Sequence, residues 1–206
     1  MSLQPHVLLN GGLYVVGPTE VTMRKEGERF LGSRVLVMTG DITSQAVDAV
    51  INAANRSLLG GGGVDGAIHR TGGPAILAAC QELRRTRYPD GLPTGEATIT
   101  PGGRLPARYV IHTVGPVNGR HDGKEADLLA ACYHNALALA VQHHLRSLAF
   151  PAISTGAFGY PRDKASAVAS ATIRNFLNND STLQEVRLIF FSPDDMVEFL
   201  RHQRFS

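Results

Sequence analysis

The strongest constraint on the fold is an alternation that begins at Arg34 and continues to the C-terminus. Short apolar runs alternate there with longer amphipathic or alanine-rich segments. The apolar runs suit strands that are covered on both faces, and the longer segments have the length and periodicity of helices. Several of these segments open with Pro, Asp or Ser, which helix starts prefer. The pattern predicts an α/β fold, a three-layer α/β/α sandwich with a mixed central sheet.

The elements can be assigned from this alternation. The expected strands are residues 35–38, 49–52, 97–100, 109–113, 147–150 and 186–190. The expected helices are residues 64–70, 74–87, 124–144, 162–178 and 193–203. In sheets of this kind, ligands bind beyond the carboxyl ends of the strands, where loops and helix N-termini converge. We therefore expect a site in the loops that follow the strands.

The first 33 residues do not follow the alternation. They contain two short apolar stretches, separated by Asn10, Gly11 and Gly12, and then a charged segment. We interpret residues 1–33 as an N-terminal extension, either an accessory hairpin or a partly ordered arm. Residues 34–206 are expected to form one domain, because a chain of 206 residues can bury one full core.

Charge and hydropathy exclude several classes of protein. The formal net charge is +2 and the 20 basic residues are scattered, which does not favour nucleic acid as a partner unless they gather on one face. No apolar stretch has the length of a membrane span, and the sequence begins without the pattern of a secretory signal. We therefore expect a cytoplasmic monomer that does not contact membranes.

The cysteines and histidines do not indicate a metal site. Cys80 and Cys132 are far apart in the sequence and have no neighbouring thiols, so we expect two reduced, buried thiols. The eight histidines form no His-Glu-x-x-His motif and show no ligand-like grouping with cysteine. The sequence therefore predicts that the protein binds no metal.

Four consecutive glycines, Gly60 to Gly63, stand in the loop between the second strand and the first helix. Backbone N–H groups without side chains, followed by a helix N-terminus, suit an anionic phosphate. A flexible linker is the alternative interpretation. Gly61, Gly63 and Gly66 also match the dinucleotide pattern G-x-G-x-x-G, but they come well after the strand, and no complete second mononucleotide half follows. We therefore favour a pyrophosphate cradle over a dinucleotide fold.

Four polar residues accompany the glycines. Asp65 can hold and polarise a water molecule, although it can equally be a first-turn acid that stabilises its helix. Asn55 can bind ribose hydroxyls, whereas its structural alternative is an Asx turn, which applies even more to Asn52. His69 lies four residues after Asp65 on the same helical face, where it can support that carboxylate or simply be structural.

Two further loops follow predicted strands. Asp41 can accept a hydrogen bond from an exocyclic amine, which would select adenine, or it can cap a helix. The loop from Ser154 to Pro161 offers backbone donors for a diphosphate, and Phe158 can lie on a ribose or fill the core. Phe191, at the end of the last strand, can stack on a base or be buried.

These segments together resemble the macrodomain family, in particular its MacroD-type branch of ADP-ribosyl hydrolases and O-acetyl-ADP-ribose deacetylases. The resemblance covers about Arg34 to the C-terminus. It rests on residues 40–43, 52–55, 60–69, 112–116 and 151–161. Other branches carry a Glu-Glu pair after the glycine loop or use a nucleophilic lysine. This chain has no Glu-Glu pair and no lysine near Asn52–Asn55.

The resemblance implies a role for each site residue. Asp65 would act in hydrolysis with a water that a substrate phosphate also positions, and Asn55 would hold the distal ribose beside it. Asp41 would read the adenine amine, with the backbone of Ile42 nearby, and Phe158 would lie against the distal ribose. The expected ligand contacts are Asp41, Ile42, Asn52, Asn55, Gly61, Gly62, Gly63, Val64, Asp65, Ser154, Thr155, Gly156, Ala157, Phe158 and Phe191, with possible support from His69.

The function expected from these residues is hydrolysis. The enzyme would remove mono-ADP-ribose from acidic residues of proteins, deacetylate O-acetyl-ADP-ribose, or do both. The expected partners are therefore ADP-ribose, O-acetyl-ADP-ribose and mono-ADP-ribosylated proteins, and no cofactor is needed. The alternative is a reader module that binds ADP-ribose without turnover, because related folds host both roles.

Overall fold

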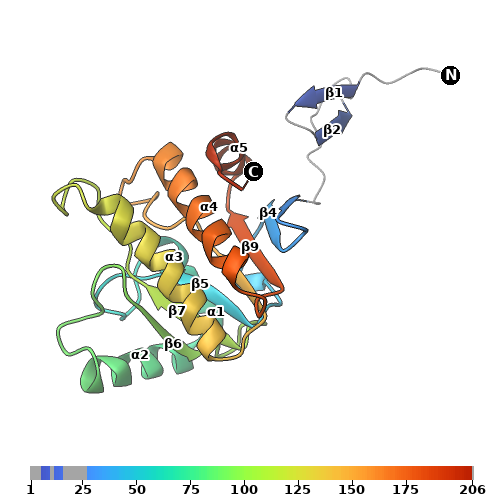
Figure 1. Cartoon of the computed structure of the whole chain (residues 1–206). Helices are drawn as coiled ribbons and strands as arrows, with labels where there is room; N and C mark the ends of the chain where they lie inside the picture. The colour runs from blue at the N-terminus through green and yellow to red at the C-terminus, as the bar shows by residue number, and fades with distance from the viewer. Residues whose placement is uncertain (1–5, 10–11, 16–26, 206) are drawn as a thin grey trace.

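A seven-stranded sheet lies at the centre of the computed structural model, which describes residues 6–9, 12–15 and 27–205 (Figure 1). In spatial order the strands are β3 (Glu28–Phe30), β4 (Val35–Thr39), β9 (Glu185–Phe190), β8 (Ser147–Phe150), β5 (Ala49–Ala53), β7 (Tyr109–Thr113) and β6 (Ala97–Pro101). The five inner strands are parallel, and the two edge strands, β3 and β6, are antiparallel to their neighbours. The sheet is therefore mixed, as the sequence predicts.

Helices cover both faces of this sheet. On one face lie α3 (Glu125–Gln142), α4 (Arg162–Asn179) and α5 (Pro193–His202), and on the other lie α1 (Gly63–Gly72) and α2 (Pro74–Thr86). Strand β5 shows why: Ala49 and Ile51 belong to the core under α3 and α4, whereas Val50 belongs to the core under α1 and α2. An uninterrupted apolar run thus packs on both sides, which confirms the three-layer sandwich.

The observed element ends differ from the expected ones by at most two residues. Strand β3 has no counterpart among the expected elements, whereas the 3-10 helix η1 (Ile42–Ser44) is the helix that the capping alternative for Asp41 implies. Strand β3 falls within residues 1–33 and pairs with β4, so that it extends the main sheet. Strands β1 (His6–Leu9) and β2 (Gly12–Val15) pair with each other in a separate two-stranded sheet. Among the described residues, no helix is both long and apolar enough to cross a membrane.

The parallel strands bring the loops of interest to one edge of the sheet. Because β4, β9, β8, β5 and β7 run in the same direction, the segments after them emerge side by side. Backbone hydrogen bonds join these segments directly: Gly40 N–H donates to Phe190 O at 2.9 Å, and Ala54 N–H donates to Thr113 O at 2.9 Å. The loop residues singled out in the sequence therefore share this edge.

Candidate functional site

Asp65 lies in the first turn of α1 and is only 4% exposed. Its Oδ1 accepts a hydrogen bond from the side-chain amide of Asn52 at 2.7 Å, and its Oδ2 accepts one from that of Asn55 at 3.3 Å. His69 Nε2 lies 3.4 Å from Oδ1. The carboxylate is thus anchored mainly through Oδ1, and Oδ2 has a single, longer contact within the described residues.

The glycine loop passes close to the less engaged oxygen of Asp65. A Cβ atom on Gly61 would lie 3.1 Å from both Asp65 Oδ2 and Asn55 Nδ2. A Cβ atom on Gly66 would collide with the Gly61 carbonyl oxygen. Gly63 has a φ of +56°, a backbone conformation that favours glycine. Asn55 Nδ2 also donates to Gly60 O at 2.8 Å. Gly60 and Gly61 are therefore closely packed, whereas Gly62 and Gly63 face open space, and the close packing is unlike a flexible linker.

The two asparagines of this segment have different surroundings. Asn55 is half-buried, and its Oδ1 accepts from Ser57 N at 2.9 Å, so it makes the Asx turn while its amide nitrogen faces Asp65. Asn52, at the end of β5, has no exposed surface. Its amide nitrogen contacts Asp65 and His112 instead. The structure therefore gives Asn52 a supporting role behind Asp65, and direct contact with a ligand stays a prediction for Asn55.

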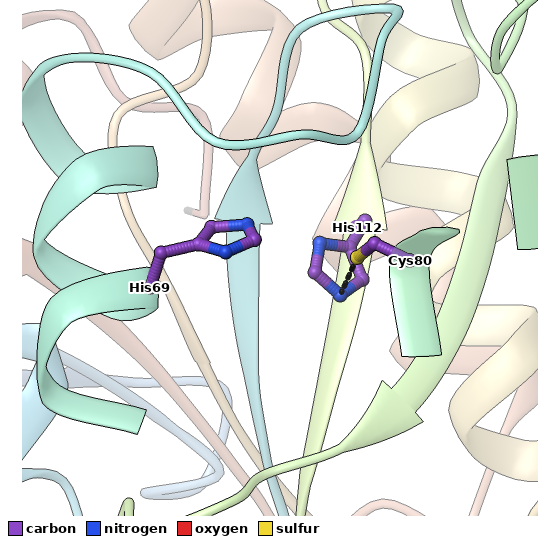
Figure 2. Close-up of side chains that lie close together, drawn as sticks. All are labelled: His69, Cys80 and His112. Carbon is purple, nitrogen blue, oxygen red and sulfur yellow. Dashed lines mark hydrogen bonds between the residues drawn. The ribbon is translucent and has the colours of Figure 1, made fainter. Parts of the chain in front are cut away.

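Behind Asn52 lies a cluster of two buried residues and one half-buried residue that spacing in the sequence did not reveal. His69 on α1, Cys80 on α2 and His112 on β7 point toward one another, and their ligand-type atoms lie within 4.8 Å of one another (Figure 2). The expectation that no histidine groups with a cysteine is therefore wrong. The sequence does contain one signal for it, because His112 interrupts the apolar strand Tyr109–Thr113.

The hydrogen bonds of His112 show how this cluster is arranged. Asn52 places its amide nitrogen against the Asp65 carboxylate and also 3.1 Å from His112 Nδ1, so Nδ1 must be the acceptor. The ring proton is then on Nε2, which donates to Thr100 Oγ1 at 2.8 Å. A protonated Nε2 cannot ligate a metal, so the donor set does not fit a metal ion in this arrangement.

Burial keeps two members of this cluster, His112 and Cys80, uncharged. Burial, with a smaller contribution from nearby His69, lowers the pKa of His112 to about 3. Burial, followed by the effect of Asp65, raises the pKa of the Cys80 thiol to about 12. The imidazole of His112 and the thiol are therefore both neutral at physiological pH.

The third loop has the backbone strain that is often found at binding sites. Ser154 has a φ of +65°, unusual for a residue with a side chain, and its buried hydroxyl makes no hydrogen bond with any described residue. Gly156 and Ala157 are exposed, and Phe158 is half-buried. The Phe158 carbonyl accepts from Asn118 N at 2.9 Å, which joins this loop to the segment after β7.

Asp41 and Phe191 follow β4 and β9, which pair side by side. Asp41 caps η1, because its Oδ1 accepts from both the backbone N–H and the hydroxyl of Thr43 at 2.8 Å. Its Oδ2 makes no hydrogen bond within the described part of the chain, and the residue is exposed. Phe190 packs on Phe199 in the core, whereas Phe191 is 93% exposed. The burial alternative for Phe191 is therefore wrong.

The order of the strands places these groups in a row. Across the edge come Asp41 after β4, Phe191 after β9, the Ser154 loop after β8, and Asn55 with the glycine loop after β5. Three strand spacings separate β4 from β5, a distance of about 14 Å. The edge thus has an exposed acid and an aromatic ring at one end, small residues between, and a buried carboxylate at the other.

Comparison with known proteins gives consistent matches. The family model for the Macro domain matches residues 51–169. An O-acetyl-ADP-ribose deacetylase of Salmonella typhimurium is 50% identical over 162 residues, which cover 79% of this chain and 89% of that protein.

Two solved structures extend this agreement to the fold. A macrodomain of Oceanobacillus iheyensis, solved with ADP, has a TM-score of 0.79 at 46% identity and covers 82% of this chain and 88% of its own. A Trypanosoma brucei macrodomain in complex with ADP-ribose has a TM-score of 0.75 at 40% identity. The match covers 82% of this chain and 68% of the trypanosome chain.

Proposed function

Because the chain belongs to the macrodomain family, we propose that it binds ADP-ribose across the carboxyl edge of its sheet and hydrolyses esters of the distal ribose. The observation that carries this proposal is the row of groups from Asp41 to Asp65. Its order matches base, diphosphate and ribose, and its span of about 14 Å suits such a molecule. The name of the deacetylase relative and the ligand of the trypanosome structure support the same assignment.

Each part of the ligand has a chemically suitable neighbour. The free Oδ2 of Asp41 accepts a hydrogen bond from the adenine amine, and the exposed ring of Phe191 stacks on the base. The diphosphate lies between the glycine loop and the loop from Ser154 to Phe158, where exposed backbone N–H groups and the N-terminus of α1 favour negative charge. The distal ribose then reaches Asn55 and Asp65.

The proposed reaction needs only water besides the ester. Asp65 Oδ2 holds a water molecule beside the distal ribose while Oδ1 stays bound to Asn52. The water oxygen forms a bond to the ester carbon while its proton goes to Asp65 or to a substrate phosphate oxygen, the ester C–O bond breaks, and that proton then passes to the departing oxygen. The products are ADP-ribose with a free hydroxyl and a carboxylic acid, either acetic acid or a protein side chain. No cofactor takes part in this scheme.

The test of this function is release of free ADP-ribose by the wild-type chain. We expect release from a protein mono-ADP-ribosylated on glutamate, from O-acetyl-ADP-ribose, or from both, together with ADP-ribose binding by calorimetry. Binding without release from either ester would identify a reader module and overturn the hydrolase proposal. Absence of ADP-ribose binding would overturn both.

The base-stacking role predicts a selective loss of affinity. Phe191→Ala is expected to weaken ADP-ribose binding about tenfold, since stacking on an aromatic ring contributes on the order of 1–3 kcal/mol. Because Phe191 is 93% exposed, the melting temperature should not change. Calorimetry checks the affinity, and Phe191→Tyr, which keeps a ring, should bind like wild type. Equal affinity of Phe191→Ala and wild type would contradict the stacking role.

A further inference from the structure

Asp65 stands at the end of a buried chain of side-chain hydrogen bonds that crosses three strands. Asp65 Oδ1 accepts from Asn52 on β5, the same amide nitrogen donates to His112 on β7, and His112 donates to Thr100 on β6. The distances are 2.7, 3.1 and 2.8 Å. All four side chains are buried, so solvent does not compete for these bonds.

The donors of Asn52 and His112 each have one acceptor in the chain. The two amide hydrogens of Asn52 are used by Asp65 and His112, and the single ring proton of neutral His112 is used by Thr100. If the Asn52 amide turned over, its oxygen would face the Asp65 carboxylate and repel it. The acceptor at His112 Nδ1 takes the second amide hydrogen and so adds to Asp65 in holding the amide in this orientation.

We propose that His112 is a positioning residue, which fixes Asp65 Oδ1 through Asn52 and so leaves Asp65 Oδ2 directed at the reacting water. This inference rests on the proposed function, because it assigns the geometry of the carboxylate in that reaction. His112 does not touch the ligand, and it exchanges no proton with it. Thr100 supports this tautomer, since its hydroxyl accepts the hydrogen bond from Nε2–H while Nδ1 accepts from Asn52.

The arrangement requires a neutral imidazole over the whole working pH range. The titratable groups around His112 are His69, whose ring centroid lies 6.3 Å away, Cys80, whose sulfur lies 3.7 Å from Nε2, and Asp65 beyond Asn52. Complete burial keeps the pKa of His112 at about 3. Positioning by His112 should therefore be independent of pH between about 5 and 9.

Strand β6 offers a matched pair of variants. Thr98 and Thr100 are two residues apart on one face of the strand and equally buried, but only Thr100 is hydrogen-bonded to His112. We expect Thr100→Val to lower kcat for ester hydrolysis about tenfold, because a slightly misplaced catalytic group loses rate steeply. KM and ADP-ribose affinity should stay unchanged. Thr98→Val should keep the wild-type kcat, and Thr100→Ser should restore it.

The tautomer itself gives a readout that does not depend on activity. The ¹⁵N chemical shifts of His112 in the wild-type chain should report a neutral ring with its proton on Nε2 from pH 5 to 8, and Thr100→Val should mix the two tautomers. A proton on Nδ1 or a charged ring in wild type would overturn the proposal, as would equal kcat values for Thr98→Val and Thr100→Val. If wild type lacks turnover, the proposed function fails, and the shifts still decide whether His112 holds Asn52.

Discussion

Replacing Asp65 by alanine is expected to lower kcat for release of ADP-ribose about 100-fold or more, the scale of a lost acid–base or water-orienting group. The affinity for ADP-ribose should change much less, because Asp41, Phe191 and the two loops proposed to bind the diphosphate are untouched. The variant removes the anchored carboxylate beside Gly61 and leaves the rest of the edge in place. Single-turnover hydrolysis, together with calorimetry of ADP-ribose, measures the two effects separately.

Two further variants separate catalysis from folding. Asp65→Asn keeps the size of the side chain and can still accept from Asn52, so it should fold well and be about as inactive as Asp65→Ala. Asp127 is an exposed acid in the first turn of α3, so Asp127→Ala tests what the loss of a first-turn acid does elsewhere. A kcat for Asp65→Asn within a fewfold of wild type would show that Asp65 only stabilises its helix.

The layers and the edge could be predicted because their signals are local. Apolar runs such as Val35–Thr39 indicate strands buried on both faces, and segments such as Pro74–Thr86 carry their own helix starts. Once parallel strands are expected, the residues after them must share an edge, which brings Asp41 and Asp65 into one site. Strand β3 was missed because its three residues, Glu28–Phe30, are too short to show a period.

What could not be predicted depends on packing between distant segments. Nothing near Asn52 in the sequence indicates that its side chain is completely buried. Nor does the sequence indicate that its amide connects Asp65 on α1 with His112 on β7. The neighbouring phenylalanines illustrate the same limit. Phe190, the last residue of β9, is buried, whereas Phe191, the next residue, is 93% exposed. Successive side chains of a strand alternate between its two faces, but only the three-dimensional structure shows which of the two is exposed.

The second large effect concerns stability in acid. His112 has a pKa of about 3 in the folded chain, whereas an unfolded histidine titrates near about 6.5. As the pH falls below about 6.5, the unfolded chain binds a proton at this residue that the folded chain excludes, so the free energy of unfolding decreases. Between pH 6.5 and pH 4.5 the loss from this one group is expected to be about 2 kcal/mol.

Urea denaturation of wild type and His112→Gln at both pH values measures that contribution. The variant cannot titrate at this position, so its stability should fall by about 2 kcal/mol less than that of wild type over the same interval. Asp48, whose pKa is lowered by hydrogen bonds from Arg146 and Ser147 despite its partial burial, loses its contribution at lower pH in both proteins and cancels in the difference. Equal pH dependence would mean that His112 accepts a proton in the folded state. If His112→Gln does not fold, an NMR titration of wild-type His112 decides the same point, because its ring should stay neutral down to pH 4.5.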